Sequence, residues 1–260
     1  MADSFAQSVK KLYTVLELER KIVGVQLLHS EAAFMAAEAI VPQRPMHYCG
    51  MVKAAAAGHA VKAASEHFAC RSGPRVLGID PDDPKNYRGE NWARLGLYCD
   101  ATVSRTIREN LVYNTKKEYG VLVQSLECYD MVPDLVLLVA TPYNCMRLTQ
   151  GYAYHHGMPT NINMIGNQAI CLECSARPYV LQDFNASLLC IGTRHRAGWK
   201  EEEMAVGFPG KQWQDIVDGV IQTMNLMESD CHKSRIETAA AKAGFTDLKI
   251  RYHHNYYMDA

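Results

Sequence analysis

The sequence predicts a single α/β domain built on a mixed sheet, and three observations lead to this class. Short apolar runs typical of buried strands alternate along the chain with segments of helical periodicity. No linker or low-complexity segment divides the 260 residues, which are enough to enclose a substantial core. Residues 20–120 and 121–230 each contain a strand, a proline-initiated helix and cysteines, as two pseudo-symmetric lobes would, with a C-terminal helix and strand in 231–260. This likeness is either a duplication, with Cys49 equivalent to Cys145, or a coincidence in a chain with nine cysteines.

The first half predicts a helix feeding a sheet. Apolar spacing indicates a helix over 4–20, and the run 22–29 follows as a strand. Alanine, the best helix former, dominates 45–66, which is therefore expected to be one helix opened by Pro45. Glycines and prolines make 71–96 a loop-rich span in which residues 75–79 are the one strand candidate.

The second half opens with two short strands and a well-defined helix. Residues 121–126 and 134–140 are the strands, and Thr141 followed by Pro142 starts a helix that runs to 156. Short strands and loops are expected over 163–196. Amphipathic spacing predicts a helix from 211, and a last helix over 234–243 precedes a strand at 246–252.

Charge and hydropathy exclude two classes of protein. The 27 Lys and Arg residues balance 28 Asp and Glu residues, so the excess positive charge typical of nucleic-acid binding is absent. No apolar run approaches the roughly 18 residues of a membrane span, and the N-terminus lacks the pattern of a secretory signal. We therefore expect a cytoplasmic protein whose nine cysteines are thiols rather than disulfides.

Cysteine is the most informative residue type. Cys49 and Cys145 fall in the first turns of predicted helices, where the helix dipole stabilises a thiolate. Cys171 and Cys174 form the one CxxC motif, but neither a helix start of the redox type nor a second zinc half-site accompanies it. Two interpretations remain. Either the cysteines are buried as small hydrophobes, or cysteines distant in sequence bind one [4Fe–4S] cluster. The expected ligands of such a cluster are Cys49, Cys70, Cys171 and Cys190.

Basic residues follow the last of these cysteines. Arg194 and Arg196 come after an apolar strand, and the forked guanidinium suits carboxylate or phosphate. We expect Arg194 on a strand leaving the cluster, turning back toward an anionic substrate; the alternative is a solvated surface turn. The common signatures of nucleotide binding, zinc proteases and serine hydrolases are absent.

Several segments together resemble the domain of unknown function 169 family. They are HYCGMVKAAAAGHAV, FAC, GPRVLGI, NASLLCIGTR and AVGFP, spread over about residues 22–228. The resemblance implies a protein frequent in anaerobic archaea and bacteria, with no activity assigned. The positions that match the family's pattern are Cys49, Cys70, Cys190 and Arg194, while Cys171 matches it less closely and Cys174 departs from it. The identity of the fourth ligand therefore stays open: either the four cysteines named above bind the cluster, or Cys174 or Cys145 replaces one of them.

These observations favour an iron–sulfur enzyme of anaerobic metabolism that acts on a small, anionic substrate oriented by Arg194 and Arg196. An electron-transfer partner and a homo-oligomer are compatible with this hypothesis, and nucleic-acid and membrane partners are not expected. The alternatives are a cluster-free enzyme whose nucleophile is Cys49, with His47 or His59 beside it, and a small-molecule-binding regulatory protein.

Overall fold

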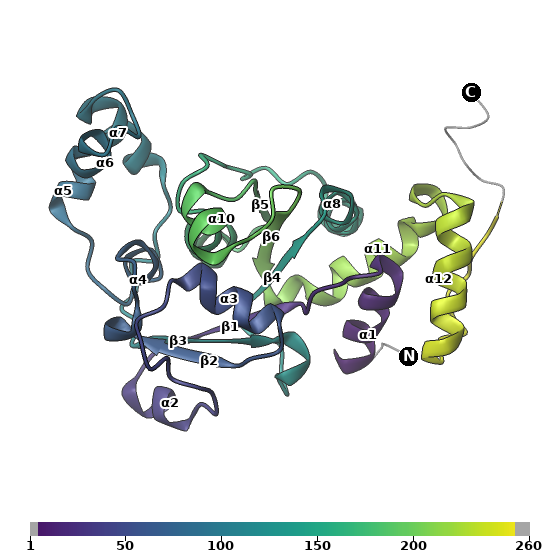
Figure 1. Cartoon of the computed structure of the whole chain (residues 1–260). Coiled ribbons are helices and arrows are strands. Elements are labelled where there is room, and N and C mark those ends of the chain that lie inside the picture. The colour runs from purple at the N-terminus through teal and green to yellow at the C-terminus, as the bar shows by residue number, and fades with distance from the viewer. Residues whose placement is uncertain (1–4, 253–260) are drawn as a thin grey trace.

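A six-stranded sheet with helices on both faces forms the centre of the computed structural model, which describes residues 5–252 (Figure 1). The strands follow the order β2-β3-β1-β4-β6-β5. Every ladder between them is antiparallel, and parallel pairing is confined to the isolated bridges Ile40–Val61 and Met46–Phe68. The sheet and its helices confirm the α/β class, whereas the sheet predicted to be mixed is antiparallel in every ladder. The strands are β1 (Val23–Leu28), β2 (Val61–Ala64), β3 (Gly120–Ser125), β4 (Leu135–Ala140), β5 (Asn185–Ser187) and β6 (Met204–Pro209).

The helices form two layers and one projecting group. One layer packs on the core that contains Val25, Val123 and Leu137, and the other packs on the opposite core, around Val136 and Phe208. The group α5–α7 projects away from the sheet (Figure 1). The helices are α1 (Phe5–Leu16), α2 (Glu31–Ala36), α3 (Tyr48–Ala56), α4 (Ser72–Val76), α5 (Pro84–Tyr87), α6 (Glu90–Arg94), α7 (Ala101–Asn110), α8 (Pro142–His156), α9 (Arg177–Leu181), α10 (Ile191–Ala197), α11 (Trp213–Met227) and α12 (Asp230–Ala243), with short 3₁₀ turns η1 (Ser65–His67), η2 (Leu126–Cys128) and η4 (Gly210–Gln212), and the π-helix η3 (Ala169–Ala176).

The two halves of the sheet have the same strand order about the β1–β4 pair. In residues 23–125 the first strand is central, the second lies at the edge and the third lies between them; residues 135–209 repeat this arrangement. In each half a helix precedes the edge strand and a cysteine follows it, directly before a short helix. This topology makes Cys49 equivalent to Cys171, and Cys70 equivalent to Cys190.

The expected equivalence of Cys49 with Cys145 is therefore wrong. Cys49 packs against the core that contains Val25, whereas Cys145 belongs to the core on the other face of the sheet. A twofold axis that relates the antiparallel neighbours β1 and β4 runs perpendicular to the sheet and keeps equivalent helices on one face. The counterpart of α3 is thus η3 rather than α8.

Several predicted elements differ from those in the structure. The helix expected over 45–66 begins at Tyr48 and ends at Ala56, because Gly58 takes a φ of 95° and a buried strand, β2, follows. The strand candidate 75–79 instead ends the short helix α4. The final strand is absent from residues 246–252, where Leu248 and Ile250 pack on the core without a neighbouring strand; residues 253–260 lie outside the described chain.

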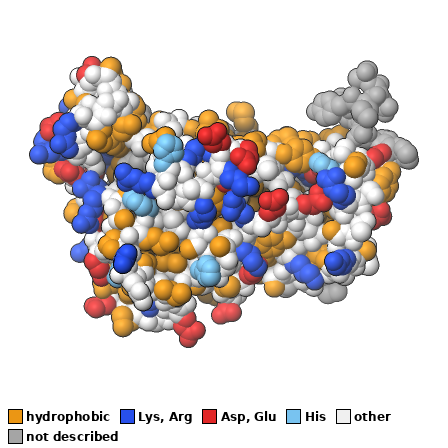
Figure 2. Space-filling view, viewed as in Figure 1, with side chains coloured by type: hydrophobic (Ala, Val, Ile, Leu, Met, Phe, Trp, Pro, Cys, Tyr) orange, Lys and Arg blue, Asp and Glu red, His pale blue; other side chains and the backbone are white. Residues whose placement is uncertain are grey.

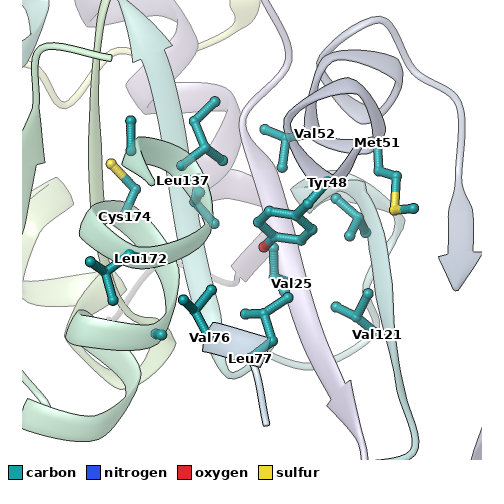
Figure 3. Close-up of a cluster of buried hydrophobic side chains, with 14 of the residues drawn as sticks. Val25, Tyr48, Met51, Val52, Val76, Leu77, Val121, Leu137, Leu172 and Cys174 are labelled. Atoms are coloured by element: carbon teal, nitrogen blue, oxygen red, sulfur yellow. The ribbon is translucent and has the colours of Figure 1, made fainter. Parts of the chain in front are cut away.

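The π-helix is the largest departure from the short strands and loops expected over 163–196. It lies directly on β6, where a Cβ added to Gly207 would come within 1.9 Å of the Cys174 carbonyl oxygen. Only glycine permits this close approach. Tyr48 of α3 joins the π-helix to the rest of the core, since its hydroxyl hydrogen-bonds Ser175 Oγ at 3.0 Å. Figure 3 shows its ring among side chains from α3, α4 and η3.

Candidate functional site

The structure brings together Cys49, Cys70, Cys171 and Cys190, which we call the cysteine quartet. Each of the four is partly exposed, whereas the other five cysteines are either exposed or buried. Cys49, Cys171 and Cys190 pack against the same hydrophobic core. The thiols are close enough to affect one another electrostatically: after burial, the charges of Cys70, Cys190 and Cys49 are the largest influences that raise the pKa of Cys171.

Each half of the sheet supplies one helical and one loop cysteine to the quartet. Cys49 lies in the first turn of α3 and Cys171 in η3, while Cys70 precedes α4 and Cys190 precedes α10. The short helices cross between the halves, because α4 packs on η3 and α10 packs on α3. The quartet therefore lies where the two halves meet, and neither half contains it alone.

Cys190 is held as the N-cap of α10. Its Sγ accepts the Thr193 N–H at 3.4 Å and lies 3.1 Å from Thr193 Oγ1. The preceding Leu189 has a φ of 65°, an uncommon conformation for a non-glycine residue. Strained backbone of this kind tends to occur at functional sites.

The segment that follows α10 holds the backbone of Cys49. Its carbonyl oxygen accepts the Trp199 indole N–H at 3.3 Å, and the Thr193 hydroxyl is near enough to the Cys49 thiol to oppose the rise of its pKa. Thr193 thus lies near both Cys49 and Cys190. Burial, followed by the charges of Cys70 and Cys190, raises the pKa of Cys49 to about 11, so burial outweighs the helix dipole that was expected to stabilise its thiolate.

Cys171 and Cys174 face different surroundings although they share one helix. In an α-helix, residues i and i+3 lie on one face, but the i→i+5 hydrogen bonds of a π-helix widen the turn and separate them. Cys174 is buried, and the charges that act on it come from Glu173 and Cys145 rather than from the quartet. Cys145 is also buried, and burial raises its pKa to about 12. The structure places neither cysteine with the quartet.

The basic residues near Cys190 have two different roles: Arg194 holds the backbone, and Arg196 lies exposed on the surface. Arg194 lies on α10 rather than on a strand, and its guanidinium donates to the carbonyl oxygens of Leu188, Lys200 and Glu203. Its donors therefore hold the loop around Cys190 rather than pointing toward a substrate. The exposed Arg196 lies close to His47, the residue before α3, and after burial its charge is what lowers the pKa of His47.

Basic side chains gather near the quartet on the surface. The space-filling view shows Lys, Arg and His side chains over α10 and the neighbouring part of α3 (Figure 2). His59, the other histidine considered beside Cys49, is exposed beyond the C-terminal end of α3. Of the two histidines, His47 is the one at the Cys49 end of the helix.

Sequence reasoning did not identify Thr193, Trp199, Tyr113 or Gln168. Thr193 and Trp199 support cysteines through contacts that only the fold creates. Tyr113 donates its hydroxyl to Gln168 Oε1 at 2.9 Å, and Gln168 is the residue before the π-helix that carries Cys171. No local pattern in the sequence marks Trp199 or Tyr113, because each contacts a residue from a distant segment of the chain.

A single metal ion and an iron–sulfur cubane require different arrangements of thiols. Within residues 5–252, no three His, Cys, Asp or Glu side chains are grouped to hold one metal ion. A tetrahedral zinc site would bring its sulfurs to about 3.8 Å from each other, given Zn–S bonds of about 2.3 Å. A cubane needs roughly 6–7 Å between ligand sulfurs.

Comparisons with known proteins give a family but no activity. Residues 11–219 match the DUF169 family model, described as uncharacterised ArCR, in agreement with the resemblance in the sequence. The chain is 25% identical over 216 residues to the uncharacterised protein MJ0308 of Methanocaldococcus jannaschii, covering 82% of this chain and 92% of that protein. No solved structure matches the chain. In the described residues no helix has the length and apolarity needed to cross a membrane.

Proposed function

The chain belongs to the DUF169 family, whose description assigns no activity, and we propose from its site that it is an iron–sulfur enzyme. In this proposal the cysteine quartet binds a [4Fe–4S] cluster, and the enzyme acts on a small anionic substrate in anaerobic metabolism. The observation that carries the proposal is the meeting of four partly exposed thiols from four segments, two from each half of the sheet.

The chemistry of the donor set suits this group. Four thiolates are the usual ligands of a [4Fe–4S] cluster, and four adjacent thiolates without a cation would repel one another in a partly buried site. Gln168 directly precedes the helix that carries Cys171. Its side-chain amide N–H is buried and makes no hydrogen bond to any described residue. Hydrogen bonds to the sulfurs are a common feature of such sites.

His47 and Arg196 are the residues that we assign to the substrate. Both lie near the Cys49 end of α3, and Arg196 is exposed with a guanidinium suited to carboxylate or phosphate. Their role is to bind and orient the anion at the rim of the site. When bound through all four cysteines, the cluster would supply electron transfer, because no iron is left open to act as a Lewis acid.

The cluster-free alternative receives less support. A nucleophilic cysteine needs a lowered pKa or an adjacent base, whereas burial and the neighbouring thiols raise the pKa of Cys49 to about 11. Burial and Arg196 also lower the pKa of His47. The pair thus lacks the thiolate–imidazolium arrangement of cysteine hydrolases.

Iron and sulfide analysis of anaerobically purified, reconstituted protein tests the proposal. We expect about four irons and four sulfides per chain, and a large loss of both when any quartet cysteine is replaced by alanine. Cys174→Ala, on the same helix as Cys171, and Cys99→Ala, on the surface, are matched controls that should keep their iron. Wild-type protein that stays colourless after reconstitution, or equal loading of quartet and control variants, would contradict the proposal.

A further inference from the structure

Gln168 combines two unfavourable features next to the cysteine quartet. Its backbone is left-handed, with φ 56° and ψ 41°, which is uncommon for a residue other than glycine. Its side chain is 5% exposed, and Nε2 makes no hydrogen bond to any described residue. A buried N–H without an acceptor costs free energy, so a partner is to be expected for it.

A second buried residue, Tyr113, makes a hydrogen bond to this amide. Tyr113 donates its hydroxyl to Gln168 Oε1 at 2.9 Å, and Nε2 is the donor that has no partner among the described residues. The Tyr113 ring is itself held, because the Arg108 guanidinium stacks over it at 3.6 Å from the ring centroid.

Gln168 and its partner Tyr113 both lie near the segment that carries Cys171. Gln168 caps the π-helix three residues before Cys171. Burial raises the pKa of Tyr113, and Cys171 is near enough to contribute to the rise. The amide held by Tyr113 is therefore part of the surroundings of the quartet.

We propose that Gln168 Nε2 donates a hydrogen bond to a sulfur of the bound cluster and raises its reduction potential. The inference rests on the proposed function. One-electron reduction adds a negative charge to the cluster, and an N–H donor stabilises the reduced state more than the oxidised state. Gln168 is a positioning and tuning residue in this account, and Tyr113 holds its amide in place.

A redox titration with dithionite, followed by electron paramagnetic resonance, measures the effect on the full-length reconstituted protein. Gln168→Met keeps the length of the side chain and removes the donor. We expect its iron content to stay normal while the equilibrium constant for reduction falls about tenfold, which is a shift of about 59 mV to more negative potential. An exchangeable proton coupled to the reduced cluster should also disappear from the electron–nuclear double resonance spectrum.

Gln212→Met is the matched control. Gln212 is a buried glutamine with an unpartnered atom, Oε1, but it lies in η4, beyond β6, and donates to the Gln182 carbonyl. Its variant should keep the wild-type potential. Tyr113→Phe, which frees the Gln168 amide to rotate, should shift the potential in the same direction by a smaller amount.

The outcomes separate this inference from the proposed function. Unchanged potentials in both Gln168→Met and Tyr113→Phe, with iron bound normally, would overturn the role of Gln168 and leave the cluster proposal standing. Wild-type protein that binds no cluster would overturn both. If Gln168→Met does not load iron, the potential of Tyr113→Phe decides the question.

Discussion

Glu228 is a buried carboxylate on which three side chains converge. It is 2% exposed, and it accepts hydrogen bonds from Arg147 Nε at 2.6 Å and from the Tyr143 hydroxyl at 2.5 Å, with His232 Nδ1 at 3.1 Å. Burial by itself would raise the pKa of Glu228, but these partners outweigh it and lower the pKa. The carboxylate thereby joins α8 to the start of α12.

Glu228→Gln should destabilise the protein in a pH-dependent way. A carboxylate with a lowered pKa contributes stability that is present above its unfolded pKa, about 4.3, and lost as pH falls through the folded value. We expect the free energy of unfolding to fall by about 3 kcal/mol at pH 7, because Arg147 is left buried without its anion, and the difference to shrink below pH 4. Urea denaturation across this range measures it.

The exposed pair of Glu17 and Arg235 provides the control for this prediction. Both side chains are about half exposed, so Glu17→Gln should change the free energy of unfolding by less than about 1 kcal/mol at any pH. A Glu228→Gln deficit that is equally large at pH 3 and pH 7 would show that the charge is not its cause.

At the scale of elements, close backbone approach decides which helices pack together. Helices α8 and α11 cross at Gly151 and Gly219, where a Cβ on Gly219 would come within 2.1 Å of the Gly151 carbonyl oxygen. The π-helix meets β6 at Gly207 in the same manner. These glycines have no role in the chemistry, yet they determine the layer that covers each face of the sheet.

Gly219→Ala should cost about 2 kcal/mol or more, because the added methyl forces the two helices apart. Gly50→Ala is the matched helical control, since its Cβ would meet only Met46 side-chain atoms at 3.6 Å; alanine there should be neutral or stabilise the helix by up to about 1 kcal/mol. Thermal unfolding of the iron-free variants compares them. Equal melting temperatures for the two variants would contradict the crossing argument.

At the scale of the whole molecule, the proposed cluster would join the two halves of the sheet. Each half contributes two cysteines, and α4 and α10 each pack on the helix of the opposite half. A ligand held by both halves binds only the folded chain, so its binding free energy adds to the stability of the fold.

Removal of iron should therefore lower the melting temperature of the protein. A gain of about 4 kcal/mol from binding corresponds to roughly 10 °C for a chain of this size. Differential scanning calorimetry before and after anaerobic chelation checks the prediction, and Cys174→Ala should behave like the wild type. Equal melting temperatures with and without bound iron would show that the cluster does not join the halves.

Local patterns in the sequence predicted the elements that depend on neighbouring residues. The apolar runs of β1, β3 and β4 and the Thr141–Pro142 start of α8 are set by burial and capping within a few residues, and the structure has them at nearly the expected bounds. The cysteines of the quartet were also identifiable as a group, because their residue type restricts the chemistry that they can perform.

Only the tertiary structure decided how these parts relate. The π-helix depends on Gly207 of a strand that follows it by some thirty residues, and the separation of Cys171 from Cys174 depends on that helix. The equivalence of Cys49 with Cys171, the structural role of Arg194 and the unused amide of Gln168 arise from contacts between distant segments. Periodicity and spacing carry information over a few turns of chain, whereas the site is formed where separate segments of the chain meet.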